Sequence, residues 1–247
     1  MFMYDNNNSK DRLRTGINGL DNMLNGGIPL NNQVVIAGGP GAGKSLLCFE
    51  VAYKNAKAGV PSIFISFEED STYMLNNIKE AFSDFNDIDK LISDKMLVIG
   101  GRDPGMIIEN SNAADKYTFG RVMSEIEKLI TDNKSKFVVI DSISLLGLLL
   151  ENELDYRRSM VTLSSNLKKL GVTAFLIIEM AISERIHMRY TPEFFIFDGI
   201  ITLYMQGEND KRALNLEIFK MRGTNHSRSV SPYEITSSGM RVFTIES

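Results

Sequence analysis

The residues best suited to chemistry form a glycine-rich run that ends in lysine and serine. The run 38–45 reads GGPGAGKS, follows the apolar segment 34–37 and precedes a segment with helical spacing from Leu46 to Ala58. Glycines let successive backbone N–H groups converge on one point, and a helix N-terminus favours anions. A strand, a glycine loop, Lys-Ser and a helix in this order predict a P-loop, which binds nucleotide phosphates.

Each position of this loop has an expected role. Lys44 supplies a mobile positive charge for the β- and γ-phosphates, and the hydroxyl of Ser45 can bind Mg²⁺. A plain glycine-rich turn is the alternative, and the flanking strand and helix argue against it. The expected phosphate-binding residues are Gly39, Pro40, Gly41, Ala42, Gly43, Lys44, Ser45 and Leu46.

Acidic residues follow three of the predicted strands. Asp141 has the pattern of the aspartate that holds Mg²⁺ indirectly in P-loop enzymes, although it could also cap a helix together with Ser142. Glu68 and Glu69 could orient or deprotonate an attacking water, or simply favour a helix dipole. Glu68 is the stronger candidate because it lies nearest the strand end. Glu179 could sense a γ-phosphate through water or merely end its strand.

Three other segments leave alternatives open. Lys220 and Arg222 alternate on one strand face, which alone indicates a solvated basic edge. The segment 145–150 (LLGLLL) is either buried helix packing or a contact with another protomer or a partner protein. The segment 183–190 contains Arg185, His187, Arg189 and Tyr190, which could grip a single nucleic-acid strand or form a solvated loop.

Alternating patterns predict an α/β fold with a mainly parallel sheet flanked by helices. Later apolar runs predict antiparallel strands that extend one edge of this sheet. The expected strands are 33–37, 62–67, 96–99, 137–141 and 173–178, and the late ones are 199–205, 213–221, 233–236 and 240–245. The expected helices are a short one within 17–24, followed by 46–58, 71–82, 117–131 and 155–170.

Length and composition limit the function classes. The 247 residues are 43% hydrophobic and 23% charged, which fits a flexible tail over residues 1–11 and one domain over residues 12–247. The net charge of −4 gives no overall attraction to nucleic acid. Cys48 is the only cysteine, so no disulfide framework is expected. Without a signal peptide or a long apolar segment, we expect no membrane insertion and a cytoplasmic location.

Three motifs together resemble one family. The opening 15–29 (TGINGLDNMLNGGIP), the segment Ser66–Glu69, and the segment 220–227 (KMRGTNHS) with 232–236 (PYEIT) beyond it resemble KaiC-type ATPases of the RecA/RadA superfamily. The last motif is similar to the KaiC-like branch rather than to true recombinases. The resemblance spans residues 15–243 and covers one domain, unlike the double-domain clock protein.

The resemblance implies a RecA-like P-loop NTPase core and a Mg²⁺-dependent ATPase. It also implies a homo-oligomeric ring, commonly a hexamer, with ATP at each boundary between protomers. Lys220, Arg222 and His226 would then reach the γ-phosphate of a neighbour, where a cation stabilises charge on the transferring group. Ile178 stands where relatives often carry Thr or Ser before the glutamate, so we expect slow turnover.

Two other function classes remain open. The first is an ATP-loaded switch with negligible turnover that docks a partner protein, which the apolar segment 145–150 favours. The second is a recombinase paralogue that binds single-stranded nucleic acid through the segment 183–190. The phosphorylatable Ser-Thr pair of the clock protein has no counterpart in this sequence, so no autokinase activity is predicted.

Overall fold

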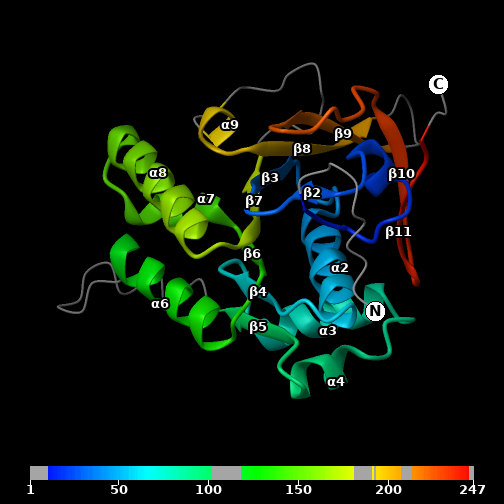
Figure 1. Cartoon of the computed structure of the whole chain (residues 1–247), viewed down its shortest axis with the longest axis horizontal. Coiled ribbons are helices and arrows are strands. Elements are labelled where there is room, and N and C mark those ends of the chain that lie inside the picture. The colour runs from blue at the N-terminus through cyan, green and yellow to red at the C-terminus, as the bar shows by residue number, and fades with distance from the viewer. Residues whose placement is uncertain (1–10, 102–117, 181–190, 192, 207–212, 245–247) are drawn as a thin grey trace.

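The computed structural model describes residues 11–101, 118–180, 191, 193–206 and 213–244. Among these residues, nine strands form one sheet across the middle of the molecule (Figure 1). The strands are β3 (Gln33–Gly38), β4 (Ser62–Ser66), β5 (Leu97–Gly101), β6 (Phe137–Asp141), β7 (Thr173–Glu179), β8 (Gly199–Gln206), β9 (Ala213–Met221), β10 (Ser231–Thr236) and β11 (Gly239–Val242).

The spatial order of the strands is β11-β10-β9-β8-β3-β7-β6-β4-β5. The strands from β8 to β5 are parallel to their neighbours, and β9, β10 and β11 are antiparallel additions at one edge. This confirms the predicted α/β fold with antiparallel C-terminal strands. One detail differs, because β8 was expected to be antiparallel and instead runs parallel to β3. The chain crosses back to the start of β3 before β8 begins, so β8 continues the parallel pattern.

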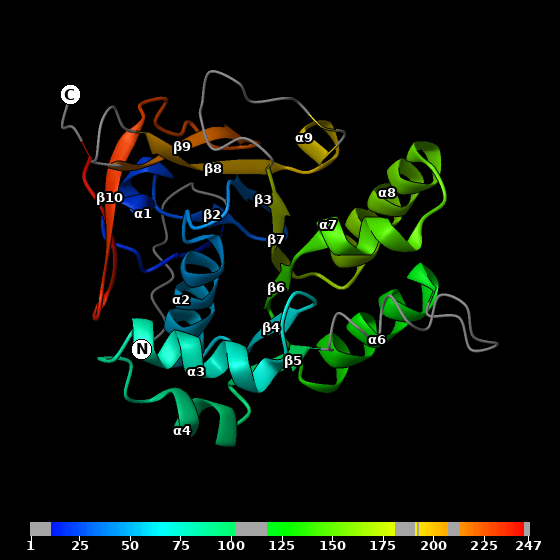
Figure 2. The same cartoon turned by 180° about the vertical axis from the view of Figure 1, so that it is seen from behind.

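The described helices lie on both faces of this sheet (Figures 1 and 2). Two short helices, α4 and α9, were not predicted, because one turn of apolar residues gives too little periodicity to recognise. The helical elements are α1 (Leu20–Met23), α2 (Lys44–Lys57), α3 (Ser71–Ala81), α4 (Ile88–Ser93), α6 (Phe119–Asp132), α7 (Ile143–Leu146), the 3₁₀ turn η2 (Gly147–Leu149), α8 (Glu153–Lys169) and α9 (Glu193–Ile196).

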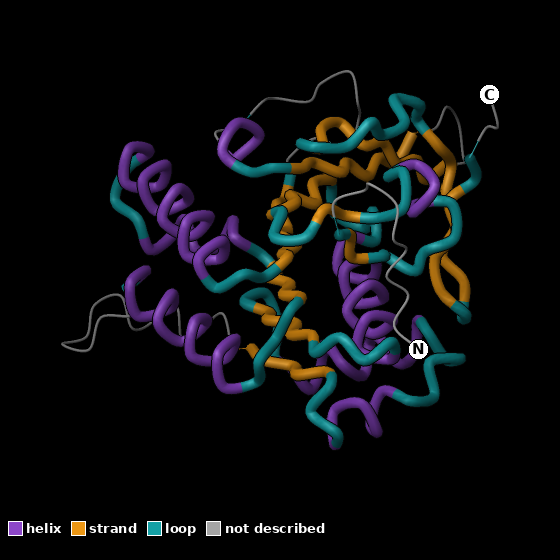
Figure 3. Tube along the Cα trace, in the orientation of Figure 1, coloured by secondary structure: helices purple, strands orange, loops and turns teal. Residues whose placement is uncertain are grey.

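Side-chain alternation along the strands builds two cores. In β3, Val34 and Ile36 pack with α2, α3 and α4, whereas Val35 and Ala37 pack with α6 and α8. All four side chains are fully buried, as expected for a strand with helices on both faces. Figure 3 shows the strands as a central layer between the two groups of helices. The sheet is therefore a rigid platform for the segments that follow its strands.

Two segments near the ends of the described chain, residues 12–29 and 231–242, pack onto this core. β1 (Arg12–Leu13) and β2 (Ile28–Pro29) form a separate antiparallel pair. The hairpin of β10 and β11 lies beside α2 (Figure 1). No helix in the described segments has both the length and the apolar character needed to cross a membrane.

In the apolar segment 145–150, most residues fit the interpretation as buried packing and one does not. It forms the end of α7 and the turn η2, and Leu146 is fully buried. Leu145 and Leu149 pack partly against the core under α6 and α8. Leu148 remains 64% exposed. Buried packing therefore explains most of this segment but not Leu148. The basic segment 183–190 lies outside the described residues.

Candidate active site

The glycine loop joins β3 to α2 at the carboxyl edge of the parallel strands. Gly41 and Gly43 have positive φ angles of 75° and 77°, which glycine adopts at no steric cost. Lys44 begins α2, two residues earlier than expected, and its ammonium Nζ donates to the carbonyl of Gly39 at 3.0 Å. The lysine side chain therefore folds back over the loop, where its charge faces the same space as the first amides of the helix.

Ser45 and Asp141 meet beside this loop. Strand order places β7 between β3 and β6, and all three strands end at the same edge. The hydroxyl of Ser45 donates a hydrogen bond to the Asp141 carboxylate at this end of the strands. Asp141 is only 4% exposed, and its Oδ1 has no hydrogen-bond partner among the described residues.

This donor set fits Mg²⁺. Mg²⁺ is usually held by one or two carboxylates together with hydroxyls, waters and substrate phosphates. The unpartnered Oδ1 of Asp141 and the hydroxyl of Ser45 supply hard oxygen donors of that kind. Among the described residues, no group of three or more acidic, histidine or cysteine side chains could hold a metal alone. Mg²⁺ at this place would therefore depend on a bound phosphate.

Burial perturbs Asp141. Desolvation, with smaller contributions from Glu68 and Glu69, raises the pKa of Asp141 to about 7, while Ser45 and Lys44 act in the opposite direction. Because the charged form of Asp141 is disfavoured in the folded protein, its contribution to stability is lost as pH rises from about 4 to about 7. An increase of this size corresponds to up to about 4 kcal/mol of lost stability.

We therefore expect Asp141→Asn to stabilise the protein without metal or nucleotide. In the presence of a chelator at pH 8, the variant should unfold at a higher temperature than the unaltered protein, because asparagine is not charged. The difference should shrink as the pH is lowered toward 5, where Asp141 becomes neutral. Thermal unfolding followed by circular dichroism at both pH values measures this, and a less stable variant at pH 8 would contradict the assignment.

Glu68 and Glu69 follow β4, whose last residue Ser66 lies opposite Asp141. The hydroxyl of Ser66 accepts the backbone N–H groups of both glutamates, at 3.3 Å and 3.2 Å. The two side chains differ, because the carboxylate of Glu69 accepts a hydrogen bond from Asn77 on α3 at 3.2 Å. Glu68 raises the pKa of Asp141 more than Glu69 does. The carboxylate of Glu68 thus acts on Asp141 more strongly than the carboxylate of Glu69.

Glu179 ends β7 at the same edge. It lies in register with Gly38, the last residue of β3 and the first of the glycine-rich run, and its side chain is exposed. Its backbone N–H donates to the hydroxyl of Ser144 at 3.1 Å. This position is beside the loop and compatible with either expected role of Glu179.

Lys220 and Arg222 lie at the amino end of the parallel strands, opposite the carboxyl end that carries the glycine loop. Lys220 pairs with Ile200, which lies beside Val35, three residues before Gly38. Three strand residues span about 10 Å, and the glycine loop extends further still. The strand register therefore separates these two cations from the loop of their own chain.

A short helix orients both cations. The ammonium of Lys220 donates to the carbonyls of Phe194 and Phe197, at 2.9 Å and 2.6 Å. The guanidinium of Arg222 donates to the carbonyl of Phe195 at 3.1 Å and to Asp198 at 3.3 Å. These bonds use only part of the three donors of a lysine and the five of an arginine.

Asp198 connects this group to the rest of the fold. It is 5% exposed, and its carboxylate also accepts Lys168 of α8 at 3.0 Å and the backbone N–H of Gln33 at 3.2 Å. Burial and the adjacent Arg222 lower the pKa of Lys220. The contact of His226 within the described residues is local, between its Nδ1 and the carbonyl of Ser227 at 2.8 Å. Sequence patterns did not reveal Asp198 or α9, since their partners are distant in the chain.

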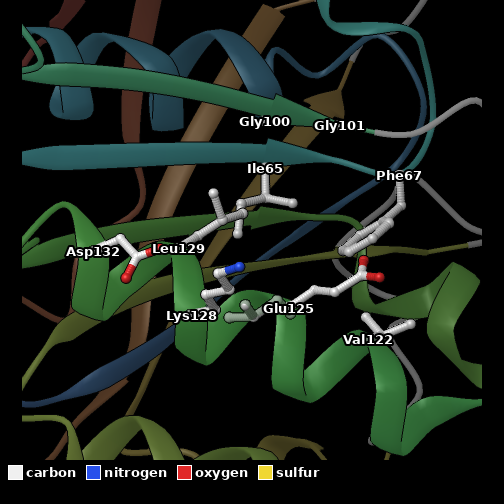
Figure 4. Close-up of a pocket in the computed structure, with 10 residues that line it drawn as sticks. Ile65, Phe67, Gly100, Gly101, Val122, Glu125, Lys128, Leu129 and Asp132 are labelled. Carbon is white, nitrogen blue, oxygen red and sulfur yellow. The ribbon is translucent and has the colours of Figure 1, made fainter.

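A hollow of about 400 Å³ lies on the face of the sheet opposite α2 (Figure 4). The carboxylate of Glu125 points toward the ring of Phe67 in this view. One residue that lines the hollow, Phe67, also contacts the region of the glycine loop. Its backbone N–H donates to the carbonyl of Asp141 at 2.5 Å. The hollow is lined by Ile65, Phe67, Gly100, Gly101, Val122, Glu125, Ile126, Lys128, Leu129 and Asp132. None of these residues belongs to the glycine loop, so the hollow is separate from the phosphate-binding region.

A comparison with protein families decides the assignment. The family model described as "ATPase: KaiC" matches residues 13–247. The chain belongs to the KaiC ATPase family. Membership supports an ATP-binding protein with a RecA-like core, in agreement with the glycine loop and the strand order.

Individual relatives agree with the KaiC family assignment. A protein of Aeropyrum pernix named "UPF0273 protein" is 31% identical over 235 residues, which cover 94% of each chain. The circadian clock oscillator protein KaiC of Rippkaea orientalis is 28% identical over 233 residues, and the match covers 94% of this chain but 44% of that protein. A crystal structure of a KaiC-like protein from Pyrococcus horikoshii has a TM-score of 0.80 at 29% identity, covering 95% of this chain and 99% of that chain.

Proposed function

We propose that this protein hydrolyses ATP at the boundaries between the protomers of a ring, commonly a hexamer in the family it resembles. One observation carries the proposal. The phosphate-binding loop and Asp141 lie at the carboxyl edge of the sheet, whereas Lys220 and Arg222 are presented at the opposite edge. Two protomers arranged head to tail bring these two edges together, and such contacts close into a ring.

In this mechanism, the loop amides and Lys44 bind the phosphates of ATP and hold them in place. Ser45 and Asp141, together with the phosphates, would hold Mg²⁺, which would supply positive charge to neutralise the phosphate oxygens. Asp141 must be ionised for this role, so its raised pKa means that loading releases a proton near neutral pH.

Glu68 acts on the attacking water. It accepts the water proton while the water oxygen forms a bond to the γ-phosphorus. The bond from the γ-phosphorus to the bridging oxygen breaks at the same time, and ADP leaves with the electron pair. Lys220 and Arg222 of the neighbouring protomer stabilise the negative charge that develops on the transferring group. His226 belongs to the same motif 220–227, and we propose that it makes a supporting contact with the γ-phosphate at this boundary.

The test measures size and turnover together. Purified full-length protein is sized by light scattering with and without Mg-ATP, while released phosphate is followed. We expect assembly and phosphate release to increase together as protein concentration rises, because each site requires two protomers. Phosphate release that is independent of assembly would contradict the boundary site. Tight ATP binding with turnover at background would instead indicate a binding switch.

A further inference from the structure

The C-terminal hairpin touches the phosphate-binding loop directly. Tyr233 of β10 is 4% exposed, and its hydroxyl donates a hydrogen bond to the backbone carbonyl of Ala42. Burial raises the pKa of Tyr233, so this hydroxyl keeps its proton across the physiological range. Tyr233 belongs to the segment 232–236, and no residue of this segment has a role in the proposed mechanism.

A second side chain of the same strand contacts the loop. Ile235 is two residues beyond Tyr233, so both side chains point to the same face of β10. A Cβ built on Gly43 would lie 2.7 Å from Cδ1 of Ile235, so a larger residue at position 43 would displace the end of this side chain. The φ of 77° is the stronger reason for glycine at this position, because the terminal methyl of Ile235 can move.

The bond to Ala42 also fixes the direction of an amide. The carbonyl of Ala42 and the N–H of Gly43 belong to the same planar peptide unit and point in opposite directions. A donor that holds the carbonyl on the β10 side therefore directs the Gly43 N–H to the other side of the loop. Converging N–H groups of this kind are what makes a glycine loop bind phosphate.

The hairpin is itself attached to the helix that follows the loop. Glu50 of α2 is fully buried and accepts the backbone N–H of Met240 at 2.6 Å. Its other oxygen pairs with Lys54 at 2.5 Å. The hairpin that carries Tyr233 is thus held to α2 by a second, independent contact, between Glu50 and β11.

We propose that Tyr233 is a positioning residue that orients the Ala42–Gly43 peptide, and thereby the Gly43 amide, for the phosphates of the nucleotide. The inference rests on the proposed function, in which ATP binds at this loop. Tyr233 does not touch the nucleotide, so it is not a catalytic residue. Because the Gly43 amide would contact phosphate before and during the reaction, its loss should affect binding more than turnover.

The test compares Tyr233→Phe with Tyr204→Phe in the full-length protein. Both tyrosines are buried and hydrogen-bonded, but Tyr204 binds Glu217 at 3.1 Å in the strands β8 and β9. Affinity for Mg-ADP is measured by calorimetry, and KM and kcat by phosphate release. We expect Tyr233→Phe to weaken Mg-ADP binding between about three- and tenfold and to raise KM with little change in kcat, as for one lost hydrogen bond.

The control separates positioning from stability. Tyr204→Phe should lower the unfolding temperature without changing the affinity for Mg-ADP. Equal affinities for all three proteins, or equal losses in both variants, would overturn the role of Tyr233. If Tyr233→Phe does not fold, Ile235→Val trims the contact on Gly43 instead, and an unchanged affinity in that variant counts against the proposal.

Failure of the proposed function gives a different pattern. An unaltered protein that binds Mg-ADP but releases no phosphate contradicts hydrolysis, and the ratio of affinities still decides the role of Tyr233. An unaltered protein that hydrolyses ATP, with Tyr233→Phe indistinguishable from it, refutes only the inference about Tyr233. An unaltered protein that binds no Mg-ADP refutes both.

Discussion

Glu68→Gln is expected to lower the rate of phosphate release by about 10²- to 10⁴-fold, the usual contribution of a general base. Glutamine keeps the size of the side chain but cannot accept the water proton. Binding of ATP should be unchanged, because the glycine loop, Lys44 and Ser45 are untouched. Single-turnover phosphate release and calorimetric ATP binding, measured on the same preparation, check both parts of this result.

Glu69→Gln is the matched control. Its carboxylate is held by Asn77 at 3.2 Å and affects Asp141 less than Glu68 does. We expect the Glu69 variant to retain a rate within about threefold of the unaltered protein, as for most exposed substitutions away from the reacting atoms. The assignment of Glu68 would be contradicted if both variants lost the same share of the phosphate-release rate. It would also be contradicted if both variants kept the rate of the unaltered protein.

Arg222→Ala is expected to lower kcat by a factor on the order of 10³, as for other arginines supplied across a boundary. Affinity for ATP should change little, because Arg222 lies at the amino end of the parallel strands, away from the loop of its own chain. The measurement is kcat at saturating Mg-ATP, with light scattering to verify that the variant still assembles.

Lys168→Ala controls for damage to the local structure. Lys168 and Arg222 share the carboxylate of Asp198, at 3.0 Å and 3.3 Å. Removing Lys168 disturbs this buried carboxylate but leaves the cation of Arg222 in place, so kcat should stay within about twofold. A loss as large as that of Arg222→Ala would show that the fold around Asp198, rather than the guanidinium, limits turnover.

The local parts of this site could be predicted from the sequence. The glycine loop, Asp141 and Glu68 each sit at the end of an apolar strand, and parallel strands of an α/β sheet bring such ends to one edge. Strand β6 has the predicted bounds, and β3 and β4 differ by one residue. Periodicity within a few residues determined these elements, so no distant contact was needed to find them.

The positioning contacts could not be predicted. Tyr233 lies 191 residues from Ala42 along the chain, and Asp198 gathers partners from β3, α8 and the end of β9. Such contacts depend on tertiary packing rather than on local sequence pattern. The short helix α9 was missed because a single turn shows too little periodicity, although its carbonyls orient both Lys220 and Arg222.

The central claim is that each ATP site is shared by two protomers, and a mixing experiment tests it most directly. Lys44→Ala removes the loop lysine but keeps Arg222, whereas Arg222→Ala keeps the loop but lacks the cation. Each variant alone should be inactive. In head-to-tail rings assembled from an equal mixture, one in four boundaries pairs an intact loop with an intact cation, so phosphate release should recover to about a quarter of the unaltered rate. A mixture that assembles into rings and stays inactive would contradict the shared site.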